Sequence, residues 1–406
     1  MAIGDIVRAG IERIAGGGEG LARIGNQRLF VGLSAPGDVV RVKISEEHKN
    51  WARAEILEIE EASPLRVEPV CPVYGRCGGC SLQHLGYEAQ LSAKEGIVRE
   101  CFSRIAGLDA LDGLISSVRP SVPFGYRNRV QFHCLPQDRS CLGFKAIRDS
   151  GVVPLSGCPV AEKGIEKALK EGTIKPPPEK DRFTVYSLDG LFLSEGGKSR
   201  GSISILGKNY TMDAGLFFQS NAAMLEALLV DLKNAAAASN HDLPLADLYC
   251  GIGTFAAFLG DGFPSLELVE KNKAALALAR ENVNNENCRF YAVSGDEWAK
   301  KHSRKCGFMV VDPPREGMSP LLRKSLAEKG PEILAYVSCD PATLARDAKE
   351  LTAVSYRLGE IRLYDFYPQT AHIESLAVFY REKETKTIYT MPEDGKLTQR
   401  QNEKIT

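Results

Sequence analysis

Four cysteines stand in a pattern that suits a metal centre. Cys71, Cys77 and Cys80 fall within ten residues, and the two glycines before Cys80 allow the backbone to fold tightly around a metal. Three close cysteines need a fourth to complete a tetrahedral thiolate set. Cys158 is the best candidate because it lies in a predicted turn. Zinc and an iron–sulfur cluster both fit this spacing.

A fifth cysteine, Cys339, follows the short apolar run Ile333–Val337. Asp340 can cap the next helix, with Pro341 at its first position. A helix N-terminus stabilises a thiolate, so we expect the pKa of this thiol to lie below its ordinary value of about 8.5. Such a thiolate is a nucleophile. A small buried cysteine is the alternative, and the local sequence favours neither.

Two further segments strengthen the catalytic interpretation of Cys339. An apolar run is followed by Asp312, two prolines and Arg315, so a stiff loop presents a carboxylate and a guanidinium to a ligand. Glu374 stands in a loop that leads into the strand-like run Leu376–Tyr380, where its carboxylate could act as a base. A loop glutamate is usually only solvated, so Glu374 means little by itself.

A glycine turn indicates a cofactor site. Gly251 and Gly253 follow the apolar run Leu245–Tyr249 and precede a helix-like run. Glu270 ends the next strand, about 20 residues further on, where a carboxylate can accept hydrogen bonds from ribose hydroxyls. This combination favours a nucleoside-type cofactor over an ordinary glycine turn. The full GxGxxG pattern is missing because position 256 is Ala256, so S-adenosylmethionine, which has no pyrophosphate, fits better than NAD.

These segments follow strands of one predicted sheet. From about residue 212, apolar runs of strand length alternate with helical runs, which indicates βαβ units and a parallel sheet. Ligands bind such sheets at the carboxyl ends of the strands. The predicted strands are Leu245–Tyr249, Leu266–Val269, Arg289–Ala292, Phe308–Val311 and Ile333–Val337, and the predicted helices are Ala222–Ala238, Lys273–Asn282 and Pro320–Glu328.

The sequence predicts a multidomain α/β protein. Residues 1–62 contain short β-rich runs between Gly- and Pro-containing turns, which is typical of an OB-like β-barrel. Residues 63–211 hold the four-cysteine pattern, a helix predicted over Tyr87–Ile105 and strand-like runs, and we assign them to a central α+β domain. Residues 212–382 form the domain with the parallel sheet. Residues 383–406 are polar and aperiodic, and we expect a tail there.

The charge is unevenly distributed along the 406 residues. The whole chain carries a net charge of −1, which argues against a nucleic-acid-binding protein. Basic residues number 8 against 10 acidic ones in 1–62, 20 against 15 in 63–211, and 23 against 27 in 212–406. The central part is therefore basic, and local charge rather than the total meets a phosphate backbone.

The composition also bears on location and partners. Eleven cysteines in a chain without a secretory signal favour metal binding or catalysis over a disulfide framework. No apolar run reaches about 18 residues, so we expect no membrane span. We expect a cytoplasmic protein with no obligate protein partner.

Taken together, the motifs resemble those of the RNA uracil-5-methyltransferase family over about residues 3–382. The matched segments are Cys71…Cys77-Gly78-Gly79-Cys80-Ser81-Leu82-Gln83-His84-Leu85, Tyr126-Arg127-Asn128-Arg129, Phe218-Gln219-Ser220-Asn221, Leu248-Tyr249-Cys250-Gly251, Asp312-Pro313-Pro314-Arg315, Ser338-Cys339-Asp340-Pro341 and His372-Ile373-Glu374. The resemblance implies an N-terminal TRAM domain, a central iron–sulfur domain and a C-terminal Rossmann-like class I methyltransferase domain. It also implies that the helix over about 83–112 packs with the catalytic domain.

The resemblance implies a role for each matched residue. Cys339 matches the nucleophile that adds to carbon 6 of a flipped uridine, and Glu374 matches the base that removes the proton from carbon 5. The positions that match contacts to S-adenosylmethionine are Gln219, Tyr249, Thr254, Glu270 and Asp312. The cysteines that match ligands of a [4Fe–4S] cluster are Cys71, Cys77, Cys80 and Cys158. The residues that we expect to contact RNA are Arg315, Arg127 and Arg129.

Several alternatives remain open at this point. The cysteine pattern together with the TRAM domain favours 23S ribosomal RNA as the substrate, and the T-loop of transfer RNA is the second choice. A non-catalytic iron–sulfur factor that binds RNA would share the same fold. A radical S-adenosylmethionine enzyme fits less well, because such enzymes usually carry C-x3-C-x2-C, whereas Cys71 and Cys77 are separated by five residues.

Overall fold

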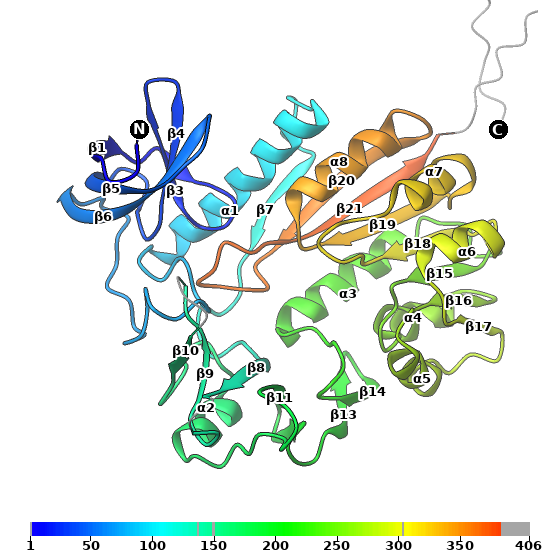
Figure 1. Cartoon of the computed structure of the whole chain (residues 1–406). Coiled ribbons are helices and arrows are strands. Elements are labelled where there is room, and N and C mark those ends of the chain that lie inside the picture. The colour runs from blue at the N-terminus through cyan, green and yellow to red at the C-terminus, as the bar shows by residue number, and fades with distance from the viewer. Residues whose placement is uncertain (1, 136–137, 148–150, 303, 383–406) are drawn as a thin grey trace, which may run out of the picture.

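The computed structural model describes residues 2–135, 138–147, 151–302 and 304–382. The predicted polar tail, 383–406, lies outside the described residues. Figure 1 shows an N-terminal barrel in blue, a central domain in green below it, and a large twisted sheet covered by helices. The predicted multidomain α/β architecture is confirmed.

The N-terminal barrel is a curled six-stranded sheet. Its strands follow the order β1-β5-β6-β4-β3-β2, and all neighbours are antiparallel except β4 and β6. Buried and exposed side chains alternate in the longer strands, so one face fills the barrel with small aliphatic residues. The strands are β1 Ile6–Gly10, β2 Arg13–Ile14, β3 Gly20–Ile24, β4 Gln27–Val31, β5 Val39–Glu47 and β6 Trp51–Glu61.

The central domain is a five-stranded antiparallel sheet in the order β10-β9-β8-β11-β12, with α2 packed against β11. The segment 62–86, which carries three of the four predicted cysteine ligands, precedes it without regular strands. An isolated bridge between Cys77 and Ala146 ties this segment to the central domain. The elements are β8 Arg129–Cys134, β9 Leu142–Lys145, β10 Val152–Pro154, α2 Lys163–Lys170, β11 Arg182–Leu188 and β12 Leu191–Ser194.

The catalytic domain is built on an eight-stranded sheet in the order β17-β16-β15-β18-β19-β21-β20-β7. The first five strands are parallel, and β21 is inserted antiparallel between β19 and β20. The strands are β7 Ile115–Arg119, β15 Leu245–Leu248, β16 Leu266–Val269, β17 Cys288–Tyr291, β18 Phe308–Val311, β19 Ile333–Ser338, β20 Tyr356–Tyr364 and β21 Glu374–Arg381.

Helices cover both faces of this sheet, which explains why its central strands are buried along their whole length rather than alternating between buried and exposed residues. Leu245 packs into the cluster with α3, α4 and α5, and Ala246 beside it packs into the cluster with α1, α6, α7 and α8. The helices are α1 Tyr87–Cys101, the π-helix η1 Phe102–Ala106, α3 Ala222–Ala236, α4 Thr254–Leu259, the 3₁₀-helix η2 Gly260–Gly262, α5 Lys273–Asn282, α6 Gly295–Lys301, α7 Pro320–Lys329 and α8 Pro341–Thr352. Among the described residues, no helix has the length and apolar character needed to cross a bilayer.

Two segments before residue 212 belong to the catalytic core in space. Helix α1 and the π-helix pack on α8, and β7 pairs in parallel with β20, so the contribution extends to Arg119 rather than to about 112 (Figure 1). The hairpin of β13 (Arg200–Ile205) and β14 (Lys208–Asp213) packs on α5, where the Asn282 amide bonds to both backbone groups of Thr211. The predicted boundary between 211 and 212 therefore falls inside β14.

The packing of the π-helix leads to a prediction on stability. Phe102 is fully buried between α1, α8 and the sheet. We expect Phe102→Ala to lower the free energy of unfolding of the catalytic domain by about 3–5 kcal/mol, through lost burial and the cavity left behind. Hydrogen exchange should become faster in α8 and β20 and stay unchanged in the barrel strands. The control is Val354→Ala, at a side chain that is 67% exposed. Faster exchange confined to the barrel would contradict this prediction.

Candidate active site and cysteine site

The register between β19 and β21 brings Cys339 and Glu374 together. Ser338 pairs with Ser375, so the next position along β19 faces Glu374. The sequence predicted Glu374 in a loop that leads into a strand. The loop position is wrong, because Glu374 is the first residue of β21, and at 3% exposed it is buried rather than merely solvated. One carboxylate oxygen, Oε1, is buried without a hydrogen-bond partner, which leaves it available to a ligand.

Cys339 occupies the predicted strand end, before α8. The cap is confirmed: the Asp340 carboxylate accepts from the Thr343 N–H at 2.8 Å, and Pro341 opens the helix. The predicted lowering of the thiol pKa is wrong. Burial, followed by the nearby carboxyls of Glu374 and Asp312, raises the pKa of Cys339 to about 11, and the Arg315 guanidinium opposes this rise.

Asp312 and Glu374 form a coupled acidic pair at the end of the sheet. Desolvation raises the pKa of Asp312 to about 7. Burial, followed by the charge of Asp312, raises the pKa of Glu374 well above its ordinary value. A carboxylate with a raised pKa holds a proton more readily, which suits a general base that works near neutral pH.

A cavity of about 1080 Å³ opens beside the glycine turn. It is lined by Tyr249 and Glu270, as expected for a cofactor site, and by the segment Ser294–Asp296 after β17. The Glu270 carboxylate accepts from the Gly251 N–H at 3.1 Å. Tyr249 has a φ of +63°, a left-handed conformation that turns the chain sharply at the end of β15.

Asp296 was missed by the sequence analysis. It lies just past the end of a strand of the same parallel sheet and lines the same cavity, so the strand-end rule that identified Glu270 could have found it. Gly295 beside it permits a close approach, because a Cβ there would lie 3.1 Å from the Tyr249 hydroxyl.

The other predicted cofactor residues lie outside this lining. Thr254 is the first residue of α4, and Asp312 follows β18. Gln219 precedes α3 and is buried, with its side-chain oxygen unpartnered. Asp247 in β15 likewise has one unpartnered carboxylate oxygen. Unsatisfied buried acceptors are costly, so these atoms mark positions where a ligand can donate hydrogen bonds.

The four predicted cysteine ligands line a single cavity. Its remaining wall includes Phe144, Leu155 and Val160. Among the described residues, no group of three or more His, Cys, Asp or Glu side chains is arranged to hold a metal ion.

The surroundings of these thiols are desolvated. Burial raises the pKa of Cys77, that of Cys80 to about 11 and that of Cys158 to about 12. Arg127 lines the cavity and shifts all three pKa values downward. The tight turn needs glycine at position 78, where a Cβ would lie 2.9 Å from the Lys145 carbonyl oxygen.

The three predicted RNA-binding arginines lie in different surroundings. Arg315 is exposed, and its Nη2 lies 3.4 Å from Nε2 of His372. Arg129 is half-buried, with its guanidinium 5.8 Å from the centre of the Phe217 ring and its Nε unpartnered. Arg127 lies between the cysteine cavity and a groove of about 2060 Å³ that separates the barrel from the central sheet.

Known proteins match this chain over nearly its whole length. A family model described as tRNA (Uracil-5-)-methyltransferase matches residues 200–383, and one described as tRNA (uracil(54)-C(5))-methyltransferase, TRAM domain, matches residues 7–65. An uncharacterized RNA methyltransferase of Treponema denticola is 34% identical over 86% of this chain and 93% of its own. The 23S rRNA (uracil(1939)-C(5))-methyltransferase RlmD of Pseudomonas fluorescens is 30% identical over 93% of this chain and 94% of that protein. The chain belongs to the RNA uracil-5-methyltransferase family.

A solved structure of the same family supports this methyltransferase fold. The Pyrococcus abyssi tRNA (uracil-54, C5)-methyltransferase, in complex with S-adenosyl-L-homocysteine, superposes with a TM-score of 0.69. It is 26% identical in sequence, and the match covers 92% of this chain and 100% of the other.

A buried carboxylate holds the Asp312 loop of this methyltransferase in place. Asp347 of α8 accepts hydrogen bonds from the Met318 N–H at 2.9 Å and the Tyr336 hydroxyl at 2.8 Å. It also pairs with Arg323 and Arg346. The sequence analysis missed Asp347, because an aspartate inside a helix carries no local signal of the loop that it will meet.

The charges around Cys339 lead to a second prediction. Asp312→Asn removes a negative charge that raises the thiol pKa, so the pKa should fall, although burial keeps it above the ordinary value. At pH 8, iodoacetamide should alkylate Cys339 severalfold faster than in the wild type, as followed by mass spectrometry of its peptide. The difference should vanish below pH 7, where Asp312 itself becomes protonated. Asp189→Asn, in a turn of the central domain, is the control. An unchanged rate at pH 8 would contradict the assigned cause.

Proposed function

We propose that this enzyme methylates carbon 5 of a uridine in RNA through a covalent adduct between Cys339 and carbon 6 of the base. The observation that carries the proposal is the β19–β21 register, which sets Cys339 against the buried, unpartnered carboxylate of Glu374. A nucleophile and a base at one point of a sheet edge are the two groups that this chemistry requires.

The roles of the two side chains follow from the reactivity of uracil. Carbon 5 is too weak a nucleophile to accept a methyl group unaided. Addition of the Cys339 thiolate to carbon 6 creates an enolate and makes carbon 5 nucleophilic. After methylation, Glu374 takes the proton from carbon 5, and the electron pair left behind expels the Cys339 thiolate. A uridine must leave its stack to reach the half-buried thiol.

S-adenosylmethionine is the methyl donor that we assign, and it supplies an activated methyl group on a sulfonium. We place it in the cavity of Tyr249 and Glu270. We assign Gln219, Thr254 and Asp312, which lie outside the lining of that cavity, as its further contacts. The structure with S-adenosyl-L-homocysteine, similar over 92% of this chain, supports the choice. A positive sulfonium near Asp312 would lower the pKa of Cys339, opposite to the effect of the two carboxyls.

We propose a [4Fe–4S] cluster at Cys71, Cys77, Cys80 and Cys158. Four thiols around one largely apolar cavity suit a cluster, whose ligands stand further apart than those of a single ion. Methyl transfer moves no net electrons, so a structural role fits better than a redox one.

For the substrate we propose 23S ribosomal RNA, with transfer RNA as the second candidate. The Pseudomonas fluorescens relative, whose name specifies 23S rRNA, is 30% identical over 93% of this chain. The transfer-RNA enzyme of Pyrococcus abyssi is 26% identical, and the match covers 92% of this chain, which supports transfer RNA as the second candidate. Arg315, Arg127 and Arg129 are the RNA contacts that we assign, and the net charge of +5 over 63–211 supports Arg127 and Arg129.

The test of substrate and nucleophile is a map of 5-methyluridine in total RNA. Cells that lack the gene should lose the modification at one or more 23S rRNA positions, and the wild-type gene should restore it. Cys339→Ala should restore none, although the purified variant should still bind the RNA. Loss confined to transfer RNA would select the second candidate. No loss in either RNA, or full restoration by Cys339→Ala, would overturn the proposal.

The cluster leads to a separate prediction. Protein purified without oxygen should contain about four iron atoms per chain and show broad visible absorption. Cys158→Ser should lose most of this iron, because it removes one of the four proposed ligands. The matched control, Cys288→Ser, changes a half-buried cysteine of β17 and should keep the iron. Zinc in place of iron in the wild-type protein would refute the cluster.

A further inference from the structure

The segment Asp365–Ile373 joins β20 to β21 and leads directly into Glu374; we call it the base loop. Its backbone bonds chiefly to segments from the first third of the chain. The carbonyl oxygen of Gln369 accepts from the N–H groups of Ser81 and Leu82, at 3.0 and 2.9 Å. The Tyr126 hydroxyl donates to the Pro368 carbonyl at 3.0 Å. The position of the base loop is therefore set largely from outside its own sheet.

One face of α1 holds the first half of the base loop, from Asp365 to Gln369. Tyr87, Gln90 and Lys94 are spaced three and four residues apart, so they lie on one side of the helix. Tyr87 donates to the Asp365 carboxylate at 2.8 Å, and Lys94 forms a fully buried ion pair with the same carboxylate. Lys94 also donates to a backbone carbonyl further along the loop.

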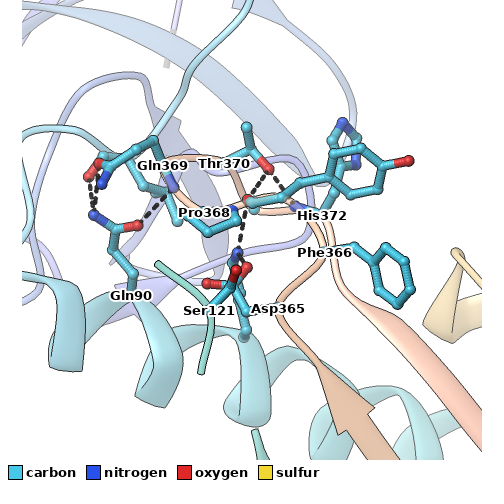
Figure 2. A network of polar contacts seen from close by, with 12 residues as sticks. Gln90, Ser121, Asp365, Phe366, Pro368, Gln369, Thr370 and His372 are labelled. Atoms are coloured by element: carbon cyan, nitrogen blue, oxygen red, sulfur yellow. Dashed lines mark hydrogen bonds and ion pairs between the residues drawn. The ribbon is translucent and has the colours of Figure 1, made fainter. Parts of the chain in front are cut away.

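Gln90 makes the central contact of this face. Its side-chain oxygen accepts from the Gln369 N–H at 2.9 Å, and its side-chain nitrogen donates to the Gln369 side-chain oxygen at 2.9 Å. Figure 2 shows the Gln90 side-chain amide beside Gln369, with one bond to its backbone N–H and one to its side-chain oxygen. The same nitrogen donates to the carbonyls of Leu82 and Leu85, so one buried amide joins the base loop to the segment after Cys80.

The backbone of Gln369 adopts a conformation that needs such support. Its φ is +68°, in the left-handed region, which costs a non-glycine residue roughly 1 kcal/mol or more. Gln369 is buried, and its side chain also donates to the Pro123 carbonyl at 3.3 Å. Gln369 is thus a strained residue held from several sides, and it lies five positions before the proposed base. This points to a requirement for precise placement of the base loop.

We propose that Gln90 is a positioning residue for the removal of the carbon 5 proton. It touches neither Cys339 nor Glu374. Through Gln369 it fixes the base loop, and the loop sets where the Glu374 carboxylate enters the site at the first residue of β21. The inference rests on the role proposed above for Glu374.

The step that Gln90 serves has a distinct signature. When proton removal is slow, the methylated base stays bonded to Cys339, because the thiolate can leave only after carbon 5 loses its proton. Covalent protein–RNA adduct then accumulates. General damage to the fold, to RNA binding or to Cys339 would reduce adduct formation instead.

The experiment compares variants on 23S rRNA isolated from cells that lack the gene. Gln90→Met keeps the side-chain length and removes the hydrogen bonds. Gln369→Gly removes the other amide, tolerates the positive φ and keeps the carbonyl that Ser81 and Leu82 use. Each variant should lower kcat by roughly ten- to a hundredfold, as displacements of about 1 Å do. The KM for S-adenosylmethionine should stay unchanged, and denaturing gels should show more adduct than in the wild type.

Three comparisons separate the outcomes. Ser92→Ala, at an exposed position of α1, should match the wild type. The double variant of Gln90 and Gln369 should be no slower than the worse single one, because both act through one contact. Lower kcat without more adduct, in whichever of the two variants folds, would overturn the inference. Glu374→Gln runs in parallel: if it accumulates no adduct, the proposed role of Glu374 fails, whatever the Gln90 variants do.

Discussion

The antiparallel insertion of β21 is the constraint on which the site depends. The carboxyl ends of parallel strands all lie at one edge of the sheet. In a purely parallel sheet, the residues at that edge are therefore those that come directly after a strand. Because β21 runs the other way, its first residue arrives at that same edge. Glu374 at the start of β21 thus faces Cys339 at the end of β19.

Desolvation has opposite consequences for the two groups. It raises the pKa of the Glu374 carboxyl, which helps it to hold a proton, and it raises the pKa of the Cys339 thiol, which hinders formation of a thiolate. A cationic methyl donor beside Asp312 would lower both pKa values, so a site of this kind gains its nucleophile when the cofactor is bound.

The chain order separates groups that the fold brings together. The segment after Cys80, helix α1 and strand β7 precede the central sheet in sequence, yet they pack on α8, β20 and the base loop. Hydrogen bonds of Ser81, Leu82 and Gln90 consequently connect the segment that follows Cys80 to the base loop, which leads into Glu374. A domain division drawn along the sequence conceals this connection.

Local patterns were sufficient for much of the architecture. The buried runs Leu266–Val269 and Phe308–Val311, the helix Lys273–Asn282 and the cap at Asp340 appear in the structure as the sequence predicts them. Each depends on periodicity or capping within one turn or strand. The short strands β2 and β3 were missed, because two to five residues with glycine carry little β signal.

The sequence by itself determined which residue types could do chemistry: a cysteine at a strand end, acids after neighbouring strands, and four cysteines near glycines. Only the tertiary structure decided how they act. Contacts between segments far apart in the chain bury Glu374 and raise the pKa of Cys339. Such contacts also hold the Asp312 loop through Asp347 and join Gln90 to Gln369 by hydrogen bonds. Desolvation and charge depend on every neighbour in space, and no local pattern contains them.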